Sequence, residues 1–190
     1  MRDVELARTT LERGADLYRQ VAAERADIIA RAAQVISDAL KHDAKVLVFG
    51  NGGSAADAQH FATEMVGRFM KERQALPVIA LTTDGAVMTA IANDLGYEQL
   101  FARQVDALGR KGDVAMAITT SGNSASVNVA LHGARAKGLI TVGLTGRDGG
   151  ETAQLVDVHV NVPDTNTQRI QETHIAILHV LCELVEQHHA

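Results

Sequence analysis

The sequence is poor in cysteine, proline and aromatic residues. Among 190 residues it has one cysteine, Cys182, two prolines, no tryptophan, four phenylalanines and two tyrosines. A single cysteine excludes an intrachain disulfide, and the acids within the first ten residues, MRDVELARTT, argue against a secretory signal peptide. We therefore expect a cytoplasmic protein.

Basic clusters and long apolar runs are also missing. The chain has 18 Lys and Arg residues against 23 Asp and Glu residues, a net charge of −5, and its basic residues are scattered. Affinity for DNA or RNA rests largely on basic side chains that contact phosphates, so direct binding of nucleic acid is not expected. No apolar run approaches the roughly 20 residues that cross a bilayer, so a membrane span is not expected either.

What the chain does have is an alternation of short β-branched runs with longer segments of helical periodicity. This alternation is typical of an α/β fold in which helices cover a parallel sheet. The length fits one domain over residues 1–190, with a helical segment at 1–41 and a core of five βα units, ending in a helix, at 42–190. The predicted strands are Lys45–Phe49, Val78–Leu81, Val114–Thr119, Ile140–Leu144 and Val156–Val162.

Two helices are predicted before the first strand. The second has a broad apolar stripe suited to packing on the sheet, whereas the first has a narrow seam suited to pairing with another helix. A helix of another subunit is the favoured partner of the seam, and a docking site within the chain is the alternative. The seam comprises Val4, Ala7, Leu11, Gly14, Tyr18 and Val21, and the stripe comprises Ile28, Ala32, Val35, Ile36 and Ala39.

A glycine-rich loop follows the first predicted strand. It reads Gly-Asn-Gly-Gly-Ser over residues 50–54, and Asp57 stands three residues after Ser54, as in a capping box. Glycines let the backbone approach a ligand, and the N-terminus of the following helix attracts anions. The loop matches neither the Walker pattern nor the dinucleotide fingerprint, and a plain tight connection is the alternative.

The third predicted strand ends in a second candidate loop, Thr119-Thr120-Ser121-Gly122-Asn123-Ser124. Its four hydroxyl groups can donate hydrogen bonds to a phosphate at the N-terminus of the following helix. An ordinary N-cap by Ser124 explains only one of the four hydroxyls. The loop therefore predicts a phosphate site.

Two predicted helices bring together residues that suit proton transfer or metal binding. His60 and Glu64 lie one turn apart on one helix, and Gln171 and His179 lie two turns apart on the last helix, about 80° apart around its axis. His174 lies about 140° from His179 and is expected to face elsewhere. The four side chains could bind zinc, or a carboxylate and an imidazole could act as general base and acid, and the two interpretations are compatible.

At these residues the chain resembles the phosphoheptose isomerases of the sugar-isomerase (SIS) domain superfamily, over nearly its whole length. The resemblance implies a flavodoxin-like, three-layer αβα sandwich with a five-stranded parallel sheet and N-terminal helices for oligomerisation. The matching segments are Gly50–His60 with Glu64, Ala92–Tyr97, Thr120–Ser124, Leu144–Gly146 with Asp148–Gly150, and Arg169–Glu172 with His174 and His179. Where the family usually has serine as the first hydroxyl of the phosphate loop, this chain has Thr119.

The resemblance also implies an activity, a metal and an assembly. The reaction would be the isomerisation of D-sedoheptulose 7-phosphate to D-glycero-D-manno-heptose 7-phosphate through an enediol, for bacterial heptose biosynthesis, in a homotetramer with sites at subunit contacts. Glu64 and His179 would transfer protons, and one zinc ion per subunit would be bound by His60, Glu64, Gln171 and His179. The sugar phosphate would be contacted by Asn51, Gly52, Gly53, Ser54, Glu64, Asn93, Asp94, Thr119, Thr120, Ser121, Ser124 and Gln171.

Two relatives within the superfamily provide alternatives. One is a non-catalytic SIS-domain protein of the DnaA initiator-associating type, in which serine and asparagine stand at the positions of Glu64 and His179. This chain has both ionisable groups, which favours the enzyme. A sugar-phosphate sensor that regulates transcription is the third hypothesis, but no segment remains for a DNA-binding appendage.

Overall fold

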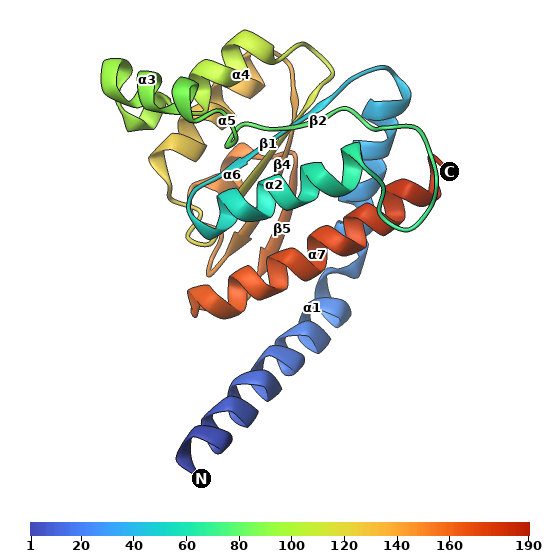
Figure 1. Ribbon diagram of the computed structural model, residues 1–190, viewed down its shortest axis with the longest axis vertical. Coiled ribbons are helices and arrows are strands. Elements are labelled where there is room, and N and C mark those ends of the chain that lie inside the picture. Colours follow the sequence, from blue (N-terminus) through green and yellow to red (C-terminus); the bar gives the residue numbers. More distant parts are fainter.

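The computed structural model describes all 190 residues and contains a five-stranded sheet surrounded by helices (Figure 1). Its elements, in chain order, are α1 (Arg2–Lys41), β1 (Val46–Gly50), α2 (Gly53–Val66), β2 (Val78–Ala80), α3 (Gly85–Leu95), the 3₁₀ turn η1 (Tyr97–Gln99), α4 (Ala102–Leu108), β3 (Val114–Thr119), α5 (Ala125–Ala136), β4 (Ile140–Gly146), α6 (Thr152–Leu155), β5 (Val158–Val162) and α7 (Thr167–Gln187).

All five strands are parallel, in the order β2-β1-β3-β4-β5. This confirms the predicted α/β class and sheet. The third strand has the predicted bounds, and the other four differ from the prediction by one or two residues at one or both ends. The chain steps from β1 to one side of the sheet and then returns to the other side with β3, so the carboxyl ends of β1 and β3 form a switch point, where ligands bind in open α/β sheets.

The central strands β1 and β3 are buried on both faces, and alternate residues along them supply two separate cores. On β1, Val46 and Val48 belong to the larger core, which also includes buried residues of α1, α2 and α7. Leu47 and Phe49 belong to the smaller core, with residues of α4, α5 and α6. The molecule is therefore an αβα sandwich, with α1, α2 and α7 on one face (Figure 1).

The prediction of two helices before the first strand is wrong, because α1 is one continuous helix of 40 residues. The segment between the seam and the stripe, AAERAD, has neither glycine nor proline and consists mainly of good helix formers, so nothing interrupts the helix there. What changes at this point is the contact surface: α1 first packs along α7 and then on the sheet. The apolar stripe moves around the helix accordingly.

The two predicted apolar surfaces of α1 have different fates. Ala32, Ile36 and Ala39 of the broad stripe are buried in the larger core, as predicted. Val21, at the end of the narrow seam, is also buried within the chain, whereas Val4 and Leu11 are 64% and 74% exposed. The first turns of α1 project away from the sandwich (Figure 1), and none of the first nine residues is even half-buried. None of the helices has the length and the apolar character that a membrane crossing needs.

Candidate active site

The two predicted ligand loops lie side by side, because they follow the neighbouring strands β1 and β3. Gly50 at the end of β1 pairs in register with Ile118 of β3. A Cβ on Gly50 would stand 2.5 Å from the Ile118 carbonyl oxygen and 2.8 Å from the Ser54 Cβ, so only glycine lets the glycine loop turn this tightly. The loop therefore opens at the switch point of the sheet.

The glycine loop starts α2 without the predicted capping box. Gly52, with φ of 58°, is the N-cap, and no side chain makes a capping hydrogen bond. Ser54 lies inside the first turn, where its N–H donates to the Asn51 carbonyl at 3.0 Å. The Asn51 side chain links the loop to its surroundings, since its amide donates to Ser126 Oγ at 2.9 Å and its oxygen accepts from the Tyr97 hydroxyl at 2.8 Å.

The loop after β3 is held in place by a buried hydrogen-bonded cluster. Gly122 has φ of 68°, and a Cβ there would collide with the backbone of Gly149. The Gly122 carbonyl accepts from both the N–H and the hydroxyl of Thr152 at 2.9 Å. Asn128 accepts from the Thr152 hydroxyl at 2.7 Å and donates to the Glu151 carboxylate at 2.9 Å. Sequence patterns gave no sign of this support, because it joins two βα units, β3–α5 and β4–α6.

The hydroxyl groups of this loop lie between the end of β3 and the start of α5. Ser124 stands at the N-cap of α5, yet its side chain makes no capping hydrogen bond, so the alternative of an ordinary cap does not account for it. Thr119 is buried, and Thr120 and Ser121 are partly exposed. The free N–H groups and the dipole at the start of α5 favour an anion at the same place.

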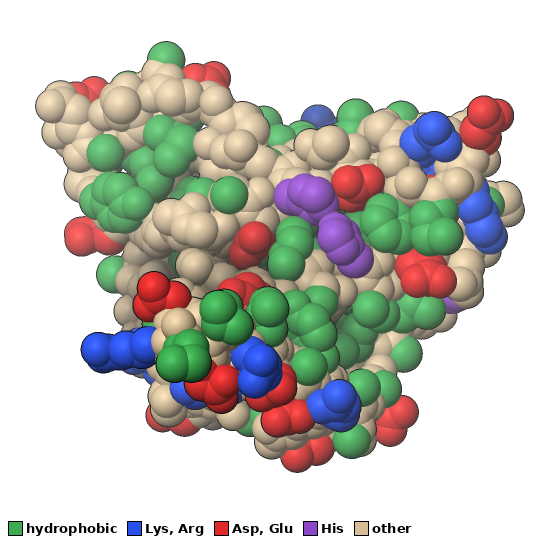
Figure 2. All heavy atoms as spheres, turned by 60° about the horizontal axis from the view of Figure 1, so that its bottom comes forward, with side chains coloured by type: hydrophobic (Ala, Val, Ile, Leu, Met, Phe, Trp, Pro, Cys, Tyr) green, Lys and Arg blue, Asp and Glu red, His purple; other side chains and the backbone are tan.

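The predicted proton-transfer residues meet where α2 and α7 run alongside each other. His60 Nε2 and His179 Nε2 are 2.8 Å apart, and the ring centroids are 5.0 Å apart. Glu64 Oε1 is 3.5 Å from His60 Nε2. Phe69, in the segment after α2, packs against His179, with 5.6 Å between ring centroids. On the face shown in Figure 2, two histidine side chains lie next to each other, beside an acidic side chain and hydrophobic ones.

Gln171 lies nearer the start of α7, beside the first residue of α2. Its side-chain amide lies against Gly53, where a Cβ would be 2.8 Å from the amide carbon. Because Gly53 meets Gln171 and His60 meets His179, α2 and α7 run in the same direction. Gln171 lies about 12 Å along α7 from His179, at 1.5 Å per residue. The contact between α2 and α7 therefore runs from the glycine loop to the histidine pair.

Other predicted residues lie outside this cluster within one chain. Asn93 and Asp94 are exposed near the end of α3, and the amide of Asn93 donates to Asp94 at 2.7 Å. His174 does not join His60 and His179, as predicted: it is buried and its Nε2 is 3.0 Å from the Thr145 carbonyl oxygen. Burial lowers the pKa of His174 to about 4, although the hydrogen bond to Thr145 opposes this shift.

Asp57, which the sequence interpretation treated only as part of a cap, has an unusual environment in the structure. Its carboxylate is half-buried, Oδ2 has no hydrogen-bond partner, and burial raises its pKa to about 6, against the opposing effect of His60. Asp57, His60 and Glu64 follow one another at i, i+3 and i+7, which places them on one helix face. That spacing was a usable signal.

The donors present suit zinc in their chemistry. His60 and His179 supply imidazole nitrogens and Glu64 supplies a carboxylate, the donor types that zinc binds in proteins, with an amide available from Gln171. At 2.8 Å the two imidazole nitrogens make one hydrogen bond, in which one ring donates its N–H and the other accepts. No three His, Cys, Asp or Glu side chains of the chain are already arranged as a metal site. Burial raises the pKa of the Cys182 thiol to about 12, with Glu64 adding to the shift, so this cysteine is no thiolate ligand.

Comparison with known proteins identifies the family. Residues 11–146 match the SIS domain family. The chain is 51% identical over 177 residues to a phosphoheptose isomerase of Geobacter sulfurreducens, covering 93% of this chain and 94% of the relative. It is 58% identical over 155 residues to one of Aquifex aeolicus, covering 82% and 81%. The chain belongs to the phosphoheptose isomerase family.

Solved structures of the family have the same fold. A phosphoheptose isomerase from Neisseria gonorrhoeae is 42% identical, with a TM-score of 0.91, and covers 98% of this chain and 100% of its own. One from Francisella tularensis is 37% identical, with a TM-score of 0.95 and the same coverage. This agreement confirms the SIS-domain fold predicted from the resemblance.

Proposed function

We propose that the chain interconverts D-sedoheptulose 7-phosphate and D-glycero-D-manno-heptose 7-phosphate in bacterial heptose biosynthesis. Membership of the phosphoheptose isomerase family makes it an isomerase. The observation that supports the assignment most is the meeting of Glu64, His60 and His179 between α7 and α2, the helix that starts at the β1/β3 switch point. The cytoplasm remains the predicted location.

The phosphate would be held at the carboxyl end of β3. Hydroxyls of Thr119–Ser121 and Ser124 would donate to its oxygens, and the N-terminus of α5 would favour its charge. At the carboxyl end of β1, Asn51, Gly52, Gly53 and Ser54 would contact the sugar, together with Gln171. Fixing one end of the substrate in this way would orient its first two carbons towards Glu64 and His179, where α2 and α7 meet. Asn93 and Asp94, which lie apart from these residues within one chain, would complete the site.

Glu64 and His179 would then move protons between C1 and C2. Glu64 takes one hydrogen of C1 as a proton while His179 gives a proton to the C2 carbonyl oxygen, which gives an enediol. Glu64 returns the proton to C2, and His179 receives the hydroxyl proton of O1, so that C1 becomes an aldehyde and no atom is gained or lost. Each properly placed acid or base contributes about 10²- to 10⁴-fold to such a rate.

Zinc is proposed as the metal, held by His60, Glu64, Gln171 and His179, one ion per subunit. When bound, zinc supplies Lewis acidity towards a carbonyl oxygen or positions the groups around it. Loss of one ligand should weaken metal affinity strongly. Zinc content after chelation and re-addition, compared between wild type and His60→Ala, tests this set; full zinc content in the variant would mean that His60 is not a ligand.

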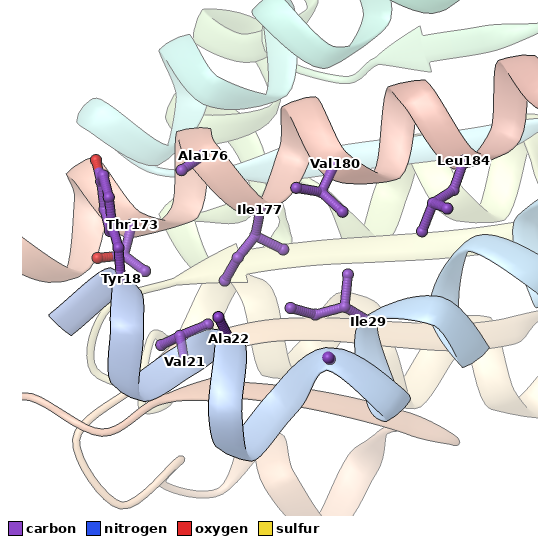
Figure 3. Close-up of a pocket in the computed structure, with 10 residues that line it drawn as sticks. Tyr18, Val21, Ala22, Ile29, Thr173, Ala176, Ile177, Val180 and Leu184 are labelled. Atoms are coloured by element: carbon purple, nitrogen blue, oxygen red, sulfur yellow. The ribbon is translucent and has the colours of Figure 1, made fainter. Parts of the chain in front are cut away.

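A homotetramer is proposed for the assembly. Val4, Leu6 and Leu11 are exposed apolar residues on the projecting part of α1. A groove of about 400 Å³ between α1 and α7 is lined almost entirely by apolar side chains, among them Ile29 and Val180 (Figure 3). Apolar surfaces of this kind are typical of sites where chains meet.

The deciding experiment is incubation of the purified protein with sedoheptulose 7-phosphate, with and without zinc, and measurement of the aldose formed. We expect turnover by the wild type and a rate about 10²- to 10⁴-fold lower for Glu64→Gln. Binding of the sugar phosphate without turnover would instead support the non-catalytic SIS-domain alternative. The family of the relatives and the presence of both Glu64 and His179 favour the enzyme.

A further inference from the structure

A buried carboxylate near the end of α7 has no part in the proposed chemistry. Glu186 is 1% exposed and accepts hydrogen bonds from three successive backbone N–H groups, those of Phe69 at 3.1 Å, Met70 at 2.8 Å and Lys71 at 2.9 Å. A buried charge is costly unless it is fully hydrogen-bonded. Burial alone raises the pKa of Glu186, but these donors and Arg73 hold it below its ordinary value.

Arg73 extends this arrangement to α2. Its side chain is fully buried, and its Nε lies 3.4 Å from the Glu186 carboxylate. Its two terminal nitrogens donate to the carbonyl of Glu64 and to that of Met65, both at 2.9 Å. The guanidinium therefore ties the last turn of α2 to the carboxylate on α7.

The turn whose N–H groups bind Glu186 also contacts His179. Phe69 is one of the three residues whose N–H groups bind Glu186, and its ring packs on His179 at 5.6 Å between centroids. One carboxylate thus connects to both proposed proton-transfer residues, to Glu64 through Arg73 and to His179 through Phe69. Neither connection involves the loops assigned to the phosphate.

We propose that Glu186 is a positioning residue that, with Arg73, fixes the separation between the His179 ring and the turn of α2 that holds Glu64. The proposal rests on the function proposed above, because it concerns the rate of proton transfer between these two groups. A displacement of about 1 Å in such groups costs on the order of 10²-fold in rate. Substrate binding through the β3 loop is unaffected by Glu186, so kcat and KM should respond differently.

The first test replaces Glu186 by glutamine, which keeps the shape but removes the charge. We expect Glu186→Gln to lower kcat about 10- to 100-fold with KM for the sugar phosphate changed less than about twofold. Asp113→Asn is the matched control. Asp113 is buried and accepts hydrogen bonds from Lys45 N at 3.0 Å, Lys45 Nζ at 2.6 Å and Arg110 N at 2.8 Å. It lies at the amino ends of β1 and β3, at the opposite edge of the sheet from the two loops. It should lose stability and keep its kcat.

A second pair of variants serves if Glu186→Gln does not fold. Phe69→Leu removes the ring that packs on His179 and should lower kcat, whereas Phe69→Tyr keeps a ring there and should retain it. A kcat that is the same in Phe69→Leu and wild type, or a kcat loss in Asp113→Asn equal to that in Glu186→Gln, overturns the positioning role.

A readout independent of activity separates this proposal from the proposed function. The ring-proton NMR signal of His179, assigned by its disappearance in His179→Gln, should move in Glu186→Gln and stay in place in Asp113→Asn. A wild type that does not convert sedoheptulose 7-phosphate would refute the proposed function. An unmoved His179 signal in Glu186→Gln would refute the positioning by Glu186, whatever the activity.

Discussion

Replacing Gly53 by alanine should separate stability from activity. Gly53 is the first residue of α2, and its φ lies outside the left-handed region, so alanine is compatible with the backbone. The three heavy atoms nearest to the added Cβ all belong to the Gln171 side chain, with the amide carbon at 2.8 Å. Since ordinary contacts begin near 3.4 Å, that group must retreat by more than about 0.6 Å. The flexible Gln171 side chain, and not the backbone, will take up this shift.

The expected consequence for stability is small and of either sign. Alanine is favoured over glycine in a helix interior by about 0.5 to 1 kcal/mol, and by less in the first turn. Activity should fall about 10- to 100-fold, because Gln171 is displaced from the glycine loop by an amount that matters for a reacting geometry. Urea denaturation measures the stability, and the initial rate of aldose formation measures the activity.

Two further variants make the result interpretable. Gly133 lies within α5, and a Cβ added to it would have no neighbour within 4 Å, so Gly133→Ala should stabilise slightly and leave the rate unchanged. Gly53→Ala combined with Gln171→Ala should be no slower than Gln171→Ala alone, because the two changes act through one group. Full activity of Gly53→Ala would refute the placement of Gln171 in the working site.

Three further outcomes are expected. His174 is neutral in the fold, because its pKa is about 4 against an ordinary value of 6.5. The unfolding free energy of the protein should therefore be highest above pH 6.5 and fall by about 3 kcal/mol as the pH drops to 4. The unfolding free energy of His174→Gln should lack this dependence. Ser121→Ala and Ser124→Ala should each raise KM for the sugar phosphate, by a loss of about 1.5 to 3 kcal/mol, with little change in urea midpoint; an unchanged KM in both would place the phosphate elsewhere. Leu11→Glu, at an exposed position, should lower the mass measured by light scattering and the turnover together, and a fully active monomer would exclude shared sites.

The sheet and its two ligand loops were predictable because the signals for them are local. Strands buried on both faces are short apolar runs, and the glycines and hydroxyls that end β1 and β3 stand directly after those runs. The pairing of His60 with Glu64 follows from helical spacing alone. These features need no knowledge of which elements touch.

What could not be predicted depends on contacts between distant segments. The seam and stripe of α1 were interpreted as two helices because the change of apolar face marks a change of neighbour, which sequence periodicity cannot distinguish from a break. The bond between Asn128 and Thr152, and that between Glu186 and the turn at Phe69, join residues 24 and 117 positions apart. Neither pair forms a pattern along the chain.

The projecting end of α1 links the order of this segment to the concentration of the protein. The first hydrogen bond between α1 and the rest of the chain is made at Thr10, whose carbonyl accepts from Arg169. The nine residues before it are exposed, and so short a helical segment is marginal in water without a neighbour to pack on. If the chain assembles as proposed, we expect these turns to fray on dissociation and to be ordered in the assembly. A substitution there should then change the association constant and leave the folding of the sandwich unaltered.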